Sequence, residues 1–252
     1  MNLKLVFRVL AFLLLIIAGI MLVPVIVAWY YREVELIPHF LWPIAITAVL
    51  ASAFLIFTRS RQNELYPREG FLLVAASWVV VSFLGAFPFY TSGAIPSFVD
   101  AFFETMSGFT TTGASILTDI EALPRSMLFW RSLTHWLGGM GIIVLTVAIF
   151  PILGIGGLQL LKAEAPGPTV DKITSKVTET AKLLWLTYFG LTAAETILLL
   201  FGGMDLFDAL TNTFGTVATG GFSPKAESIG AYESAFIDVV ITAFMVMAGI
   251  NF

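Results

Sequence analysis

Apolar residues occur in long uninterrupted runs along this chain. Four runs contain no Asp, Glu, Lys or Arg: residues 9–31, 36–58, 71–99 and 132–161. A fifth run, 183–204, holds one charged residue, Glu195, and a sixth begins near Ala235 and is still apolar at Phe252, so we expect its helix to be unfinished. Because about 20 apolar residues cross a bilayer as a helix, the pattern predicts an all-α integral membrane protein.

Residues 88–124 interrupt this simple pattern. Pro88 and Pro96 are expected to break the helix, and the apolar stretch 98–109 that follows is only about half a membrane span in length. Ser97 lies three residues before Asp100, a spacing typical of a helix N-terminus. We therefore predict a short re-entrant helix over 98–109, followed by the loop TTTGAS.

The same arrangement recurs 108 residues downstream. A gap-free window of 16 residues contains six identities, at positions 100, 101, 105, 111, 113 and 115 and their counterparts. The cap is repeated as well, since Asp205 lies three residues before Asp208. The predicted repeat unit is a spanning helix, a pore helix, a loop and a spanning helix, as in potassium channels.

This repeat divides the chain into three parts. Residues 1–69 form two extra transmembrane helices, and residues 70–177 form the first pore-loop repeat with a cytoplasmic connector. Residues 178–252 form a second repeat whose last helix is cut short.

The repeated loops have the composition of a cation filter. Backbone that is not helical is tolerated at membrane depth only where protein shields it or where it lines a water-filled cavity. A row of carbonyls with threonine hydroxyls can replace the hydration shell of a cation, and glycine allows successive carbonyls to face the same way. A single Thr/Gly-rich loop would be ordinary turn material, but two capped copies favour a filter. The candidate ion-binding residues are Thr110, Thr111, Thr112, Gly113, Ala218, Thr219, Gly220 and Gly221.

Composition and charge agree with a membrane protein. Of the 252 residues, 58% are hydrophobic and 12% are charged, against the roughly 25% charged residues of a soluble domain. The net charge of −4 leaves no basic surface for nucleic acid, and the absence of cysteine excludes thiolate metal sites. Nine of the 13 basic residues lie at the start of the chain, after the second run, or between the fourth and fifth runs. The positive-inside rule then places the N-terminus in the cytoplasm.

The motifs DAFFETMSGFTTTGAS, FWRSLTHWLGGMGIIVLTVAIFPILGIGGLQLLKAEAPGP and FDALTNTFGTVATGGFS resemble the potassium uptake proteins of the Trk/Ktr/HKT superfamily, most closely its bacterial TrkH-type subunits. The resemblance implies potassium uptake across the bacterial inner (plasma) membrane, ion coordination by the carbonyls of 110–113 and 218–221, and no covalent cofactor. It also implies a homodimer and a cytoplasmic TrkA-type nucleotide-binding regulator. Serine in place of the first-loop glycine accompanies sodium preference in this superfamily, so Gly113 favours potassium.

One feature departs from the superfamily pattern, which places four such repeats around one pore. This chain has two, so we expect it to be the N-terminal half of a longer protein or to pair with another chain. A non-conducting fragment or assembly partner is the alternative. An intramembrane enzyme is disfavoured, because it needs a nucleophile and base or a metal cluster that converge inside the bundle.

Several further residues have two interpretations each. Glu195 is either an ion or proton relay or, as we favour, a hydrogen-bonded side chain facing the bundle. Arg131 and His135 share one helix face and either line the outer mouth or serve packing, whereas a metal site is disfavoured. Gly138, Gly139 and Gly141 favour close helix packing over a hinge. Trp130 and Trp136 are interfacial or inter-helix aromatics, and the basic stretch 162–182 is a plain connector or a contact for lipid or a regulator.

Overall fold

The structure is a computed structural model that describes residues 3–57, 67–141 and 177–250, and all the regular elements in these residues are helices. Four helices are long and apolar enough to cross a membrane: Leu3–Tyr30, Val34–Phe57, Arg68–Thr91 and Leu183–Phe201. They confirm four of the expected runs. The greater part of the run 132–161 and the basic stretch 162–182 as far as residue 176 lie outside the described residues.

The first two spans form the N-terminal pair of helices. α1 (Leu3–Ile20) and α2 (Leu22–Tyr30) together make one span, and after the short η1 (Val34–Leu36) the chain returns as α3 (Ile37–Phe57). α1 begins before residue 9, where the uncharged run starts, because Lys4 and Arg8 are part of the helix. Long basic side chains at a helix end can extend toward the interface while their stems stay in apolar surroundings.

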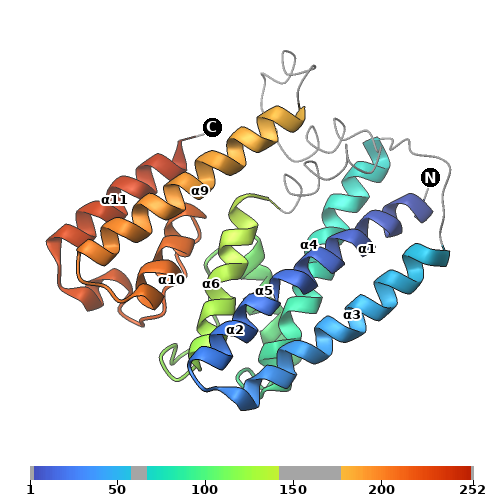
Figure 1. Cartoon of the computed structure of the whole chain (residues 1–252), viewed down its shortest axis with the longest axis horizontal. Coiled ribbons are helices and arrows are strands. Elements are labelled where there is room, and N and C mark those ends of the chain that lie inside the picture. Colours follow the sequence, from blue (N-terminus) through green and yellow to red (C-terminus); the bar gives the residue numbers. More distant parts are fainter. Residues whose placement is uncertain (1–2, 58–66, 142–176, 251–252) are drawn as a thin grey trace.

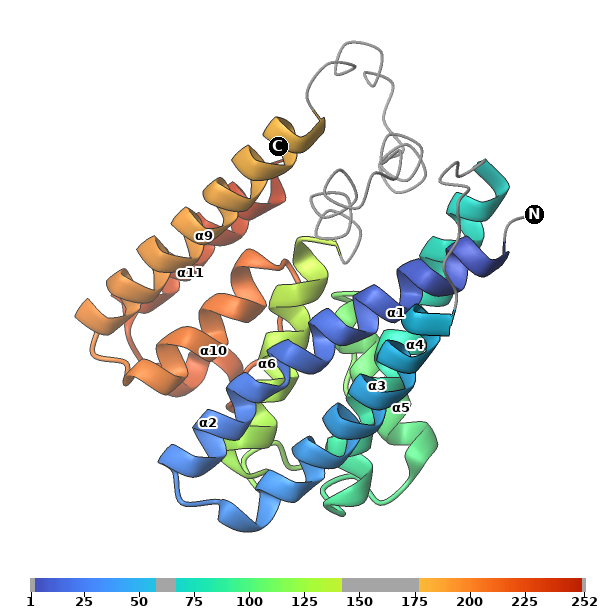
Figure 2. The same cartoon turned by 45° about the vertical axis from the view of Figure 1, so that its right-hand side comes forward.

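The predicted repeat is present twice. The first copy consists of α4 (Pro67–Thr91), α5 (Phe98–Phe109) and α6 (Arg125–Gly139), and the second of α9 (Val177–Phe201), α10 (Leu206–Val217) and α11 (Ala235–Gly249), with η3 (Ser228–Tyr232) before α11. In Figures 1 and 2 the second copy lies on the α6 side of the first. α6 packs against both pore helices, α5 and α10.

The interpretation of Pro88 as a helix breaker is wrong. Pro88 lies inside α4, which continues to Thr91. Transmembrane helices tolerate proline when neighbouring groups satisfy the backbone around it. The turn comes instead at Gly93, which has a φ of +76°.

Both predicted caps of the pore helices are confirmed. The Ser97 side chain accepts a hydrogen bond from the Asp100 backbone N–H at 3.4 Å, and Asp205 accepts one from Asp208 N–H at 2.7 Å. These caps satisfy amide groups that the first helical turn leaves unpaired. As a result, α5 and α10 begin and end at equivalent positions in the two copies.

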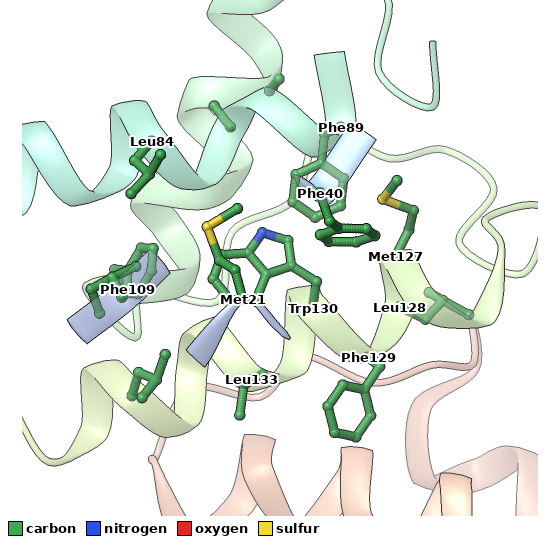
Figure 3. Packing of buried hydrophobic residues seen from close by; sticks show 14 of the residues in the cluster. Met21, Phe40, Leu84, Phe89, Phe109, Met127, Leu128, Phe129, Trp130 and Leu133 are labelled. Carbon is green, nitrogen blue, oxygen red and sulfur yellow. The ribbon is translucent and has the colours of Figure 1, made fainter. Parts of the chain in front are cut away.

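The main apolar core joins the N-terminal pair, the first repeat and α10 of the second repeat. Figure 3 shows Trp130 of α6 among Met21, Phe40 and Phe89, which come from three other parts of the chain. Trp130 is fully buried, and its indole N–H donates to the carbonyl of Gly85 at 2.9 Å. α6 is therefore held by this core and also packs against α10 of the second repeat.

Candidate ion-conducting site

The two candidate loops, residues 110–113 and 218–221, have matching backbone conformations. Thr111 and Thr219 have φ values of 52° and 56°, and Gly113 and Gly221 have φ values of 75° and 87°. A positive φ is uncommon for any residue with a side chain, and for a β-branched one it is a marked outlier. Its recurrence at equivalent threonines shows that the repeat extends to the loop backbone.

Hydrogen bonds at the end of each pore helix explain this conformation. In the first copy Thr111 N–H donates to Gly108 O and Thr112 N–H to Ser107 O, at 3.1 and 3.0 Å. The second copy has the same pair of bonds, from Thr219 to Thr216 and from Gly220 to Gly215, both at 2.9 Å. This is the Schellman ending of a helix, in which the residue after the cap turns left-handed.

The Schellman ending directs the amides and the carbonyls of the loops to different places. The N–H groups of residues 110–112 and 218–221 donate to carbonyls of the pore helix that precedes them. Among the described residues, no hydrogen bond ends on the carbonyl oxygens of Thr111, Thr112, Gly113, Thr219 or Gly221. Carbonyls without a protein partner can coordinate a cation that has lost its water.

The threonine hydroxyls of the first loop are partly occupied. Thr110 Oγ1 donates to Met106 O at 2.7 Å and lies 2.8 Å from Thr112 Oγ1. The hydroxyls therefore stabilise the turn as well as offering acceptors.

The two loops touch each other. A Cβ atom added at Gly113 would overlap the carbonyl oxygen of Gly220. Position 113 therefore requires glycine for two reasons: its positive φ and the close approach of the second loop.

A buried ion pair connects the surroundings of the two loops. Arg131 Nε of α6 lies 2.7 Å from Glu104 Oε1 of α5, and the side chains are 3% and 0% exposed. Glu104 also accepts from Ser115 Oγ and from Ile116 N–H, just after the first loop. On the other side, Arg131 Nη1 donates to Ser223 O at 3.1 Å, just after the second loop.

This network was not predicted from the sequence. Arg131 was expected to line the outer mouth or to serve packing, Ser115 and Ser223 were singled out only as a repeat identity, and Glu104 was not singled out. A usable signal was present, because a carboxylate inside a re-entrant helix and an arginine at the start of a spanning run each need a partner of opposite charge when they are buried.

The packing interpretation of the α6 residues is confirmed. Arg131 and His135 are buried, and Cβ atoms at Gly138 and Gly139 would overlap Phe109 and Ala218, so these glycines let α6 approach the ends of both pore helices. Trp136 is an inter-helix aromatic, whose indole N–H donates to Thr192 Oγ1 of α9 at 3.0 Å.

Glu195 of α9 is fully buried, as the bundle-facing interpretation requires. Neither of its carboxylate oxygens has a hydrogen-bond partner within the described residues, so the expected hydrogen bonding is not observed.

A cavity of about 350 Å³ lies beside the second loop. Its wall includes Thr219, Gly220 and Gly221 of the loop, Thr216 of α10 and Met245 of α11. One side of this loop is therefore open to a space large enough for water and ions.

Comparison with known proteins identifies the family. A family model described as TrkH, cation transport protein, matches residues 37–252. The chain belongs to the TrkH family. Membership in this family of transport proteins agrees with the resemblance drawn from the motifs and decides against the intramembrane enzyme.

Individual TrkH-family relatives match all or most of this chain. The Trk system potassium uptake protein TrkH of Escherichia coli (strain K12) is 42% identical over 254 residues, which cover 100% of this chain and 52% of that protein. TrkI of Halomonas elongata is 35% identical over 229 residues, or 90% of this chain and 46% of that protein. The crystal structure of the potassium transporter TrkH from Vibrio parahaemolyticus matches with a TM-score of 0.84 and 36% identity, covering 100% of this chain and 51% of that one. The chain thus spans about half the length of the curated relatives it matches.

Proposed function

We propose that this chain supplies two of the loops of a potassium-selective pore and takes part in potassium uptake. The ion-binding groups are the carbonyls of residues 110–113 and 218–221. The observation that carries the proposal is the matched Schellman ending of the two pore helices, which turns loop amides back to the helix and leaves the carbonyls of residues 111–113, 219 and 221 without a hydrogen-bond partner among the described residues.

The electrostatics of the pore helices support a cation. Both α5 and α10 end directly at a loop, and the C-terminal end of a helix carries a partial negative charge. Among the described loop residues there is no carboxylate, so selectivity rests on carbonyl dipoles.

Two loops provide only part of a coordination shell. The resemblance to the superfamily implies four repeats around one pore, and this chain spans about half the length of its relatives. We therefore expect the chain to conduct only together with two further loops, and on its own to be non-conducting.

We further propose how the chain is divided into parts, in which membrane it lies and with which partners it assembles. The chain is divided at residues 69/70 and 177/178 into an N-terminal helix pair and two repeats, and it acts in the inner (plasma) membrane as part of a homodimer with a TrkA-type nucleotide-binding regulator. The N-terminus is cytoplasmic. The orientation is supported by the nine basic residues and by Figures 1 and 2, in which the start of α1, the end of α3 and the starts of α4 and α9 lie toward the same end of the bundle.

A chimaera tests the proposal. This chain replaces the matched segment of the E. coli relative, and potassium and sodium uptake are measured in cells that lack their own potassium uptake systems. The wild-type chimaera is expected to take up potassium in preference to sodium, and the chain alone is expected to take up neither. Gly113→Ser should remove the preference, because a side chain at 113 forces the loops apart.

Gly93→Ser is the matched control. Gly93 has a φ of +76°, close to the 75° of Gly113, but a Cβ there meets no atom within 4 Å. The control therefore carries the same backbone strain without contact between the loops. If Gly113→Ser and Gly93→Ser leave the same potassium preference, the filter assignment is wrong.

A further inference from the structure

His135 of α6 lies between the two loops. It is fully buried, and its Nδ1 is 2.9 Å from the carbonyl oxygen of Gly108 in the last turn of α5. A carbonyl oxygen can only accept, so Nδ1 carries the proton and donates. The same carbonyl accepts the Thr111 N–H that closes the Schellman ending, so His135 is joined directly to the turn that shapes the first loop.

The other edge of the imidazole contacts the second loop. The ring stacks on Phe222 with a centroid distance of 3.8 Å and an interplanar angle of 12°. A Cβ atom at Gly220 would overlap ring atoms Cδ2 and Nε2, so the ring lies directly against the Gly220 backbone. One rigid ring therefore touches the turn before the first loop and the middle of the second.

The contact extends to the point where the loops meet. A Cβ atom at Gly113 would overlap Gly220 O and lie 4.0 Å from His135 Nε2. Nε2 has no hydrogen-bond partner among the described residues, so this edge of the ring acts through its shape. Arg131 lies one turn earlier on α6, and its guanidinium carbon lies over the ring of the same Phe222, 3.5 Å from the ring centroid.

We propose that His135 is a specificity-determining positioning residue, which sets the separation of the two loops and thereby the preference for potassium over sodium. The inference rests on the proposed function. His135 does not coordinate the ion; it fixes the distance between the carbonyls that do. Because protein interiors are close-packed, a change in the thickness of this spacer moves the loop backbone.

The test uses the chimaera with His135→Leu, which removes both the donor and the flat ring, and His135→Gln, which keeps a donor. Phe40→Leu is the control, because Phe40 is equally buried but belongs to α3 and lies in the main apolar core. His135→Leu is expected to lower the potassium-to-sodium uptake ratio by about tenfold, which equals ~1.4 kcal/mol in relative barrier height. His135→Gln should fall between, and Phe40→Leu should keep the wild-type ratio.

A second measurement covers variants that accumulate poorly. The purified proteins are melted in potassium chloride and in sodium chloride at equal ionic strength, because a bound ion stabilises the folded state. The extra stability in potassium should shrink in the His135 variants and stay unchanged in Phe40→Leu. A merely structural role would lower the melting temperature equally in both salts, and this result would overturn the proposal.

Gly113→Ser separates the two claims. If it changes the uptake ratio while both His135 variants keep the wild-type value, the filter assignment stands and the role of His135 is refuted. If the wild-type chimaera shows no potassium preference, the proposed function itself fails.

Discussion

Two single residues, Glu104 and Arg131, carry charges inside the bundle, where an unpaired charge is costly. Glu104 and Arg131 are buried within 2.7 Å of each other, and the remaining carboxylate oxygen and guanidinium donors reach the segments after the two loops. Removing one partner of a buried pair leaves an uncompensated charge, whereas removing both costs less.

Glu104→Gln is therefore expected to lower the free energy of unfolding by about 3–5 kcal/mol, measured by denaturant titration in detergent. The double variant Glu104→Gln/Arg131→Met should recover part of the loss. Lys225→Gln, which breaks the exposed Lys225–Glu121 ion pair at 3.0 Å, is the control and should have a small effect. A single variant at Glu104 as stable as the control would contradict the role of the buried pair.

The exposed pair itself has a pH dependence with a definite sign. A hydrogen bond from Lys225 lowers the pKa of Glu121, so folding favours the charged carboxylate. The contribution is complete above the ordinary carboxylate pKa of about 4.3 and is lost as the pH falls through the lowered pKa of Glu121. The difference in melting temperature between wild type and Glu121→Gln should thus be present at neutral pH and vanish in acid. A difference that grows on acidification would contradict the assignment.

At the scale of elements, α6 is held in place by contacts from distant parts of the chain. Its N-terminus is capped from a distant part of the chain, because the Glu33 carboxylate accepts the backbone N–H groups of Arg125 and Ser126 at 2.8 and 2.9 Å. These are amides that the first turn of a helix leaves unpaired. The N-terminal helix pair, through the segment that links α2 to α3, therefore determines where α6 begins.

Replacing Glu33 by alanine should destabilise the protein by about 0.5–2 kcal/mol, the range for loss of a helix cap. Hydrogen exchange should increase first at the amides of Arg125 and Ser126. Glu35→Ala, at an exposed position in the neighbouring turn, is the matched control. Unchanged exchange at those two amides in Glu33→Ala would show that the cap does not hold α6.

The elements that local signals govern could be predicted from the sequence. The cap and the length of the pore helix 98–109, and of its counterpart, depend on residues that are neighbours in the sequence. α5 accordingly has the expected bounds. The end of α4 could not be predicted in this way, since Pro88 breaks a helix in water and not in this bundle. The contacts of Gly113 with Gly220 and of His135 with both loops also depend on tertiary packing, which joins residues far apart in the chain.

At the scale of the whole molecule, the second repeat packs through α10 against α6 of the first repeat, and one side of the second loop lies beside an open cavity. The candidate residues 110–113 and 218–221 were expected from the sequence because the two copies of the repeat match without gaps over 16 residues. Whether they bind an ion remains a prediction, and it is the central claim of the proposed function.

The most direct test is crystallography of the chimaera in thallium ions, which mimic potassium and give an anomalous signal. The account predicts anomalous density between the carbonyl oxygens of residues 110–113 and 218–221, with loss of this density in Gly113→Ser and retention in Gly93→Ser. Density elsewhere in the bundle, with none beside these carbonyls, would contradict it.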